Sequence, residues 1–542
     1  MPEGLFLPKL FKLLLTFLLV FAATINAQDN AVGSSEHSSA EISTEIYVIR
    51  DIDFNIVGRT RAFALMHNGR FTQGVRIEGS ENLERYIRDR IQDLNNQRVL
   101  DNSHTRIEYT LGAREADGTI PVNLVVYTRD SNNFVILPYP EYSTNDGFSI
   151  TLKARDYNFL GTMTPLRFDL GYQLNQNDDH IFRFSFDIDM PFQAAGLNWN
   201  LIFDNNFTYE PDYPLNYDTR VGLSVNIPWW ISTLTFGINQ FLYINDDVSS
   251  DSRNYYGVNQ NYYDPYFSTE LFGAIRIPLG LEVGPYGQLS YTFRTSYRLY
   301  YPTISSDLPL RPTNSYSNTI GFGSTNWVGN FRRGLSASAN VSNTIYINNN
   351  EAPFRTTLDF GINYHEHFAN YFGISTRLRY RAFWRYSDRF DSYLYENTGS
   401  ALRGIIDNEL RATQILFLNF DFSSYVLRFW PSEWFNAPGL SFFNVEVHLT
   451  PFTDLALVKG SIRDSGASDP AYRQWRDIDF SFNDIVATAG LEVIIFSGFF
   501  RSLSLRGSLG FNLDKLKRDG LVLMGGFFPR WHEIYIGLDR AF

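Results

Sequence analysis

The sequence predicts a mainly β protein: a transmembrane antiparallel β-barrel of about 16 strands (16 to 18), preceded by one small α+β domain. Three observations lead to this prediction. Segments between residues 133 and 542 alternate apolar and polar side chains, as strands with one apolar face do. Charged residues occur in mid-strand on the polar face, which suits a wet lumen. Connections alternate between short turns and long polar loops, as expected for the two ends of an outer-membrane barrel.

The composition argues against several classes of protein. The 542 residues include 46 Lys+Arg and 58 Asp+Glu, so the formal net charge is −12, which disfavours nucleic acid as a partner. The chain has no cysteine, and this excludes disulfides, thiolate nucleophiles and Cys-ligated metals. Aromatic residues make up 16% of the chain, a content that an ordinary soluble enzyme seldom has.

The N-terminus predicts export. Lys9 and Lys12 precede an apolar run over residues 13–23, and Ala27 follows, so we expect residues 1–27 to be a secretory signal peptide. The alternative is a membrane anchor, but the run is shorter than the ~20 residues of a spanning helix. Residues 28–43 are rich in Ser, Ala and Glu and are expected to form a flexible linker. A large exported chain without disulfides indicates a Gram-negative-type outer membrane.

Residues 44–132 predict the small α+β domain. The expected order is a strand at 46–54, a helix at 61–67, a helix that begins at Ser80, and strands at 105–111 and 121–127. The second helix has an apolar face at helical spacing, and Asp117-Gly118 supplies the turn between the last two strands.

Residues 133–542 predict the barrel. Segment 182–190 is the clearest strand, with Phe182, Phe184 and Phe186 on one face and Arg183 and Asp187 on the other. A soluble sandwich alternates in the same way. A sheet in hydrocarbon must close on itself, because every backbone donor and acceptor needs a partner within the protein. Four arginines would form a basic stripe along the lumen: Arg377, Arg379, Arg381 and Arg385.

The C-terminal segment 535–542 is apolar and ends in an aromatic residue. Such a last strand resembles the insertion signal of bacterial outer-membrane barrels, with Tyr535, Gly537 and Phe542 as its marked positions. An apolar terminus without a signal role is the alternative.

Several short motifs, in their order along the chain, resemble the BamA/TamA-type outer-membrane assembly superfamily. Asn158, Gly161 and Thr162 match its early Asn-x-x-Gly-Thr-Gly turn, with Met163 in place of the last glycine. Residues 401–405, Ala-Leu-Arg-Gly-Ile, resemble the Val-Arg-Gly-Phe/Tyr motif of its sixth external loop. Residues 452–456, Phe-Thr-Asp-Leu-Ala, resemble its Phe-x-Asp-x-Gly motif, and residues 44–132 are similar to a periplasmic POTRA domain.

The resemblance assigns roles to residues around the loop motif. It implies that Leu402, Arg403 and Gly404 form the tip of a loop that folds into the lumen. Arg403 would meet Asp454, which lies with Phe452 on the barrel wall, and Asp421 is a second candidate acid. A solvated Arg-Gly turn is the alternative. Thirteen strand-like segments precede Arg403 where the family has eleven, and five follow it.

Candidate catalytic groups are few. His365-Glu366-His367 offers two metal ligands in what we interpret as a solvated turn, and His448 lies near Glu446 on the lumenal face. Neither set is complete, so we predict no enzyme, no catalytic or metal site and no cofactor.

The resemblance implies a factor that assembles, inserts or translocates proteins by templating strands at a barrel seam and at an edge of the POTRA-like domain, either 107–111 or 122–127. Its partners would be outer-membrane lipids, unfolded outer-membrane or secreted clients, and accessory lipoproteins, with no nucleic acid. The alternatives are a passive pore lined by the basic stripe, a surface-exposed structural protein, and a two-partner secretion translocator.

Overall fold

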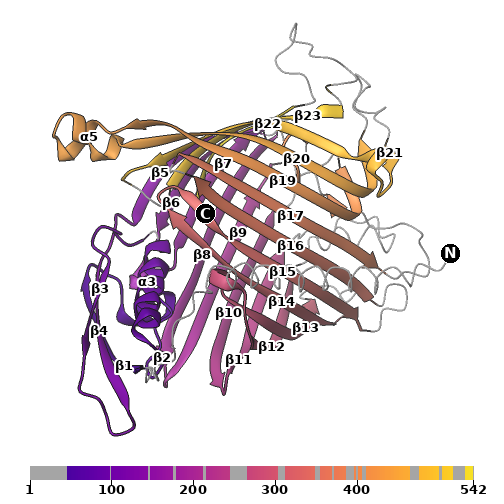
Figure 1. The fold of residues 1–542 in the computed structure, drawn as a ribbon. Coiled ribbons are helices and arrows are strands. Elements are labelled where there is room, and N and C mark those ends of the chain that lie inside the picture. Colours follow the sequence, from indigo (N-terminus) through magenta and orange to yellow (C-terminus); the bar gives the residue numbers. More distant parts are fainter. Residues whose placement is uncertain are drawn as a thin grey trace.

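The computed structural model contains a four-stranded mixed sheet with two helices, followed by a closed barrel (Figure 1). The predicted signal peptide and linker lie outside the described residues, as does Phe542. The structure describes residues 45–97, 99–143, 147–174, 179–211, 215–244, 265–302, 312–347, 354–368, 371–385, 396–397, 401–405, 410–463, 475–499, 503–514, 516 and 532–540.

The N-terminal domain has the element order that its sequence predicts, with one additional short strand. Its elements are β1 (Ile46–Val57), α2 (Ala62–Asn68), β2 (Arg76–Glu78), α3 (Ser80–Asn96), β3 (Arg106–Leu111) and β4 (Thr119–Arg129). The sheet order is β2-β1-β4-β3, with β1 and β4 parallel. The core is formed by apolar side chains of β1, β4 and both helices, among them Ile49, Leu65, Leu83, Leu94 and Leu124.

The two candidate edge segments of this domain have different positions. β4 pairs with β1 on one side and β3 on the other, so its backbone is used within the sheet. β3 pairs only with β4 and is an edge strand of the sheet, where Tyr109 and Leu111 are exposed. Of the two predicted alternatives, the edge is therefore the one at 107–111.

The barrel is antiparallel, and its strands follow one another in sequence order. Those before Arg403 are β5 (Phe134–Ser143), β6 (Gly147–Asp156), β7 (Leu166–Leu174), β8 (His180–Ala194), β9 (Leu197–Tyr209), β10 (Asn216–Trp229), β11 (Ser232–Ile244), β12 (Tyr266–Glu282), β13 (Gln288–Pro302), β14 (Thr313–Val328), β15 (Phe331–Tyr346), β16 (Phe354–Phe368) and β17 (Phe372–Arg385). Those after it are β19 (Leu410–Phe429), β20 (Val445–Arg463), β22 (Val486–Ser497), β23 (Leu503–Asn512) and β24 (His532–Arg540).

Eighteen strands thus form the wall in the described part of the chain. Two short strands, β18 (Glu396–Asn397) and β21 (Trp475–Ile478), pair only with β19 and β20. The count lies at the upper end of the predicted range and exceeds its central value of about 16. Thirteen wall strands precede Arg403 and five follow it, so the additional hairpin indicated by the alternation is present.

The wall is apolar outside and charged inside. On the outer face of β7 and β8, Tyr172 pairs with Phe182 and Leu170 with Phe184, and Leu170 is 52% exposed. On the inner face, Arg167 binds Asp187 at 3.0 Å. An outer surface of this kind is costly in water and suits hydrocarbon. Among the helices of the described residues, none is long and apolar enough to cross a bilayer.

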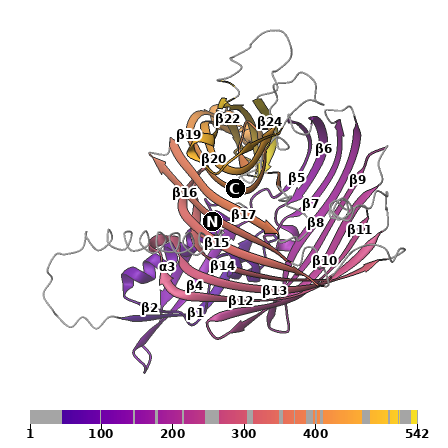
Figure 2. The ribbon, with the colours of Figure 1, turned by 90° about the vertical axis from the view of Figure 1, so that its right-hand side faces the viewer.

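The barrel closes where β24 meets β5 (Figure 2). Nine register pairs join β24 to β23, whereas two join it to β5, Tyr535 with Ser143 and Ile536 with Tyr142. Because each ladder pair satisfies backbone donors and acceptors, this seam is the weakest junction of the wall in the described residues.

Candidate functional site

Arg403 lies inside the barrel and is bound to the wall strand β20. Its backbone N–H and its Nε both donate to Oδ2 of Asp454, at 2.9 and 3.0 Å, and its Nη2 donates to Oδ1 at 2.7 Å. Asp454 is fully buried. Both carboxylate oxygens are therefore engaged by one residue of the loop, in the two-pronged geometry that favours arginine over lysine.

Two further carboxylates and an aromatic ring complete the surroundings of the Arg403 guanidinium. Nη2 lies 2.6 Å from Oδ1 of Asp421 on β19, and Nη1 lies 3.5 Å from Oε2 of Glu492 on β22. The ring of Phe452 packs 3.9 Å from the guanidinium carbon. Glu492 also accepts a 2.8 Å hydrogen bond from Arg506 on β23.

Gly404 connects the loop to the last two strands. Its N–H donates to Oε2 of Glu533 on β24 at 2.7 Å. Its φ is +94°, and a Cβ at this position would lie 2.7 Å from the backbone N of Phe511 on β23. Only glycine permits both this backbone conformation and this approach. Residues 401–405, which we call the lid loop, thus touch every wall strand from β19 to β24.

The apolar residues on either side of Arg403 hold the lid loop in place. Leu402 and Ile405 are each 1% exposed and pack against inward side chains of β19, β20 and β22, including Leu410, Ile415 and Val458. An aliphatic side chain therefore fills the position where the family motif has an aromatic one. A buried apolar contact of this kind stabilises the pose by roughly 1.5–3 kcal/mol per side chain.

Part of the positive charge of the basic stripe is neutralised by ion pairs within the wall. Arg379 and Arg381 share one carboxylate, Asp359 on β16, at 3.4 and 2.9 Å. Arg377 lines a cavity of about 390 Å³ beside the lid loop, together with Arg403, Asp421 and Glu492. Arg385 ends β17, and its side chain lies outside the described part of the structure.

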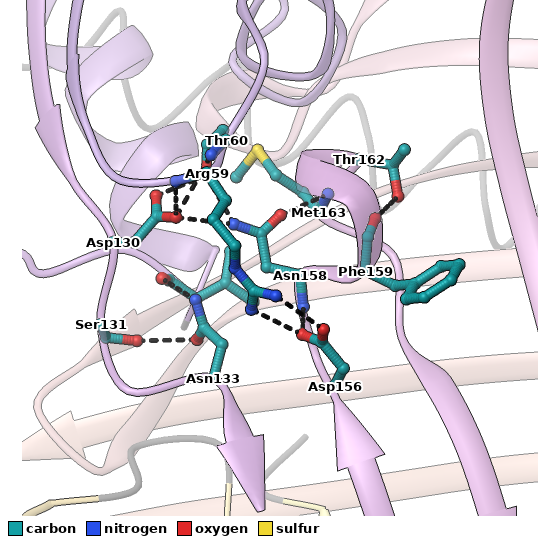
Figure 3. A network of polar contacts seen from close by, with 11 residues as sticks. Arg59, Thr60, Asp130, Ser131, Asn133, Asp156, Asn158, Phe159, Thr162 and Met163 are labelled. Carbon is teal, nitrogen blue, oxygen red and sulfur yellow. Dashed lines mark hydrogen bonds and ion pairs between the residues drawn. The ribbon is translucent and has the colours of Figure 1, made fainter.

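The early turn motif joins the N-terminal domain to the barrel (Figure 3). Asn158 is fully buried between β6 and β7. Its amide nitrogen donates to Oγ1 of Thr60 at 2.7 Å and to Oδ2 of Asp130 at 3.0 Å, and its oxygen accepts from the N–H of Met163 at 2.9 Å. Asn158 therefore connects the segment after β1, the end of β4 and its own turn.

A bidentate ion pair and a backbone contact reinforce this junction. Arg59 donates to both oxygens of Asp156 at 2.9 Å, and its hydrogen bond to that carboxylate raises the pKa of the Arg59 guanidinium. Gly161 accepts from the N–H of Arg61 at 2.9 Å, and its φ is +75°. A Cβ on Gly161 would lie 2.0 Å from the carbonyl oxygen of Arg59. Thr162 donates to the carbonyl of Phe159 at 2.7 Å and closes the turn.

The same domain has a second attachment halfway around the barrel. Oδ1 of Asn96, at the end of α3, accepts from the backbone N–H of Trp327 at 3.0 Å, and its Nδ2 donates to Oδ1 of Asn326 at 2.9 Å. Both partners lie near the end of β14. The domain is therefore fixed to the rim at two points, the β6–β7 turn and the end of β14.

The C-terminal motif lies at the seam as far as the structure describes it. Tyr535 is one of the two β24 residues in register with β5. Gly537 is buried, and a Cβ there would lie 2.1–2.2 Å from the hydroxyl oxygens of Tyr535 and Tyr139. The glycine thus allows Tyr139 of the first strand to approach the last strand.

The candidate histidines His365, His367 and His448 lie in strands of the barrel wall. His448 is 1% exposed among the rings of Phe331 and Phe496, and its Nε2 lies 2.6 Å from Oε1 of Glu446. His365-Glu366-His367 belongs to the end of β16, so its interpretation as a turn is wrong. Within the ranges described, no cluster of three His, Asp or Glu side chains is placed to hold a metal ion.

Sequence reasoning missed four participants of these sites. Glu492 and Arg506 lie in strand-like segments, and their alternation with apolar neighbours could have placed them in the lumen. Glu533 carries no such signal. Arg59 lies in a loop, and only the tertiary fold brings it to Asp156.

Comparisons with known proteins give distant structural neighbours. No protein-family model and no curated protein matches this sequence. Among solved structures, CdiB from Acinetobacter baumannii is 12% identical, covers 91% of this chain and 74% of its own, and has a TM-score of 0.45. BamA from Haemophilus ducreyi lacking POTRA domains 1–3 is 12% identical, covers 91% of this chain and 85% of its own, and has a TM-score of 0.38. CdiB from Escherichia coli is 9% identical, covers 95% of this chain and 97% of its own, and has a TM-score of 0.39.

The identities and TM-scores of these neighbours do not assign a function to this chain.

We predict that Arg403→Ala leaves the barrel folded but frees the lid loop. The substitution leaves the Asp454 carboxylate buried without its guanidinium, a change that typically costs about 3–5 kcal/mol. Hydrogen exchange at Gly404 and Phe511 should accelerate strongly. Arg333→Ala, which removes a solvent-exposed arginine paired with Glu366, is the matched control and should leave both amides protected. Unchanged protection in Arg403→Ala would contradict the assignment.

We predict that Asn158→Leu loosens the junction between the two domains. The substitution keeps the branched shape of the side chain but removes three hydrogen bonds, and each partner left buried and unsatisfied costs about 1–3 kcal/mol. Proteolysis should then cut near Arg59 and Met163, where the wild type resists. Asn123→Leu, at an exposed position on β4, should behave as wild type. Equal resistance of the two variants would show that the junction does not depend on Asn158.

Proposed function

We propose that this chain is an outer-membrane protein that inserts or translocates other proteins by pairing their strands with its own strand edges. No covalent chemistry is involved in this mechanism. The observation that carries the proposal is the seam, where two register pairs close a wall that the lid loop braces from inside. An exposed strand edge binds an incoming strand through backbone hydrogen bonds, which requires neither cofactor nor nucleotide.

The lid loop supports a seam that can open without collapse of the barrel. Arg403 and Gly404 bind side chains on β19, β20, β22 and β24. These contacts hold the C-terminal strands together as one body. When the two β5–β24 pairs separate, the edge of β24 therefore keeps its shape and is ready to receive another strand.

The N-terminal domain would supply a second edge, in the periplasm. We interpret it as a POTRA-like domain because β1, α2, α3, β3 and β4 follow the POTRA order. Its edge strand β3 is exposed, and the attachments at Asn158 and Asn96 hold it in a fixed position relative to the barrel. Unfolded outer-membrane or secreted chains would pair with β3 before they reach the seam. The involvement of accessory lipoproteins stays a prediction.

The passive pore is a less well-supported alternative. Two of the four arginines that would line it are bound to Asp359, and the lid loop occupies the lumen. A two-partner secretion translocator would share the same architecture and differ in its client, so it is a variant of the proposal. Nothing in the described contacts favours a purely structural surface protein.

We predict that a disulfide across the seam blocks activity. Tyr142 and Ile536 face each other in register and are 40% and 48% exposed on the outer surface. In a chain without cysteine, Tyr142→Cys/Ile536→Cys should form a single crosslink. Oxidation should abolish the delivery of client barrels to proteoliposomes, and a reductant should restore it.

The control for this experiment is a crosslink elsewhere in the wall. Leu491 and Leu509 are a facing pair between β22 and β23, also on the outer surface. Leu491→Cys/Leu509→Cys should remain active when oxidised. Full activity of the oxidised seam variant would refute templating at the seam.

We predict a small, fluctuating conductance in planar bilayers, because the lid loop lies in the lumen. Arg403→Ala should give larger and longer openings, since the loop loses its main attachment. A steady, anion-selective conductance in the wild type would instead favour the passive pore.

A further inference from the structure

The connection between β19 and β20 differs from the others at the barrel end that carries the N-terminal domain. It spans residues 430–444, whereas residues 195–196 join β8 to β9 and residues 157–165 join β6 to β7. It contains a short helix, α5 (Pro431–Trp434), and a 3₁₀ segment, η6 (Pro438–Phe443). Figure 1 shows α5 projecting away from the barrel, apart from the N-terminal domain. We call residues 426–444 the aromatic hairpin.

The hairpin leaves the wall at a defined point. β17 ends its pairing with β19 at Ser424, and β19 continues beyond it with β20 as its partner. The register shifts between Tyr425 and Leu427, so Val426 is a bulge residue. A bulge bends the strand and increases its twist, which turns the tip away from the barrel axis.

The hairpin is ordered by its own contacts. Asn444 accepts from the N–H and Oγ of Ser432 at 3.3 and 3.0 Å. The ring of Phe429 packs edge-on against Trp434 at 5.0 Å, and Phe442 packs against Phe499 at 5.9 Å. Because these contacts fix the backbone of the hairpin, its outer side chains have defined positions.

Those outer side chains are large and apolar. Trp434, Phe435, Phe442 and Phe443 are 60%, 71%, 49% and 57% exposed. The hairpin has one cation and one anion, Arg428 and Glu433, and they bind each other at 3.0 Å. The Arg428 guanidinium also lies 3.9 Å from the ring of Trp430. The surface is therefore apolar and electrically balanced, and it offers little to a charged partner.

The patch continues the outer face of the barrel. Outward apolar side chains of β19 and β20 lead to it, with Ser424 and Thr453 among them on that face: Phe420, Leu427, Phe429 and Leu449, each 36–52% exposed. The β10–β11 turn at the same barrel end also exposes Trp229 and Trp230, at 59% and 90%. Exposed Trp and Phe at the end of a lipid-facing surface are typical of the membrane–water interface.

We propose that the aromatic hairpin lies in the headgroup region of the periplasmic leaflet and anchors the β19–β24 side of the barrel in the lipid. Its occupant is the phospholipid surface itself. Aromatic side chains would be buried to the depth typical of interfacial segments, about 5–10 Å. The anchor lies on the same group of strands that the lid loop braces, so it would hold that side in the membrane while the β5 side moves.

The test uses the full-length protein with one introduced cysteine, which is unique because the natural chain has none. Phe435→Cys and, separately, Phe443→Cys are labelled with nitrobenzoxadiazole and reconstituted into vesicles of phosphatidylethanolamine and phosphatidylglycerol. We expect blue-shifted emission and stronger quenching by a lipid nitroxide near the glycerol backbone than by one at the middle of the acyl chain. Two positions keep the test informative if one variant fails to fold.

Two labelled references give the limits of the scale. Glu81→Cys on α3, whose side chain is 88% exposed, should report water and be quenched by iodide. Leu170→Cys on the outer face of β7 should report the lipid interior. Labels at both hairpin positions that behave like the Glu81→Cys label would overturn the proposal. Shielding that appears only after a periplasmic extract is added would also overturn it, because the occupant would then be a protein.

Discussion

The buried guanidinium of Arg403 is the interaction on which the arrangement of the C-terminal strands depends. One side chain faces carboxylates from three strands, Asp421, Asp454 and Glu492, and the next residue reaches a fourth on β24. Carboxylates collected in a lumen repel one another, and the guanidinium offsets this repulsion. The lid loop is thus part of the wall's electrostatic balance, and its removal changes the wall as well as the opening.

The N-terminal domain is held by a different kind of contact. Asn158 and Asp130 form a polar junction in which Gly161 leaves no space for a larger side chain. At the second attachment, the side-chain amide of Asn96 contacts the backbone N–H of Trp327 and the side chain of Asn326. The first attachment is dense and enclosed, and the second consists of a few amide contacts. If the domain moves, the weaker attachment at Asn96 will release before the one at Asn158. The domain will then rotate about the Asn158 junction.

The sequence predicted those features that depend on a repeating pattern of apolar and polar residues or on a short motif. Alternation located the strands on both sides of Arg403 and placed Asp421 and Asp454 on their polar faces. The resemblance of the motifs, and not the alternation, implied that these acids meet Arg403. Glu533 and the Arg59–Asp156 pair could not be predicted, because closure of the barrel and docking of the domain create those contacts. The eighteen wall strands lie at the upper end of the expected range, because thirteen of them precede the arginine where the family pattern has eleven. The turn expected at His365-Glu366-His367 is the end of strand β16, in which successive side chains point to opposite faces.

The extra hairpin before Arg403 has a geometric consequence. Barrel diameter grows roughly in proportion to strand number, so eighteen strands in place of sixteen enlarge the cross-section by about a quarter. A lid of the same length covers proportionally less of that area. That difference leaves more room for hydration water beside the lid loop and, under the proposed function, for a client chain.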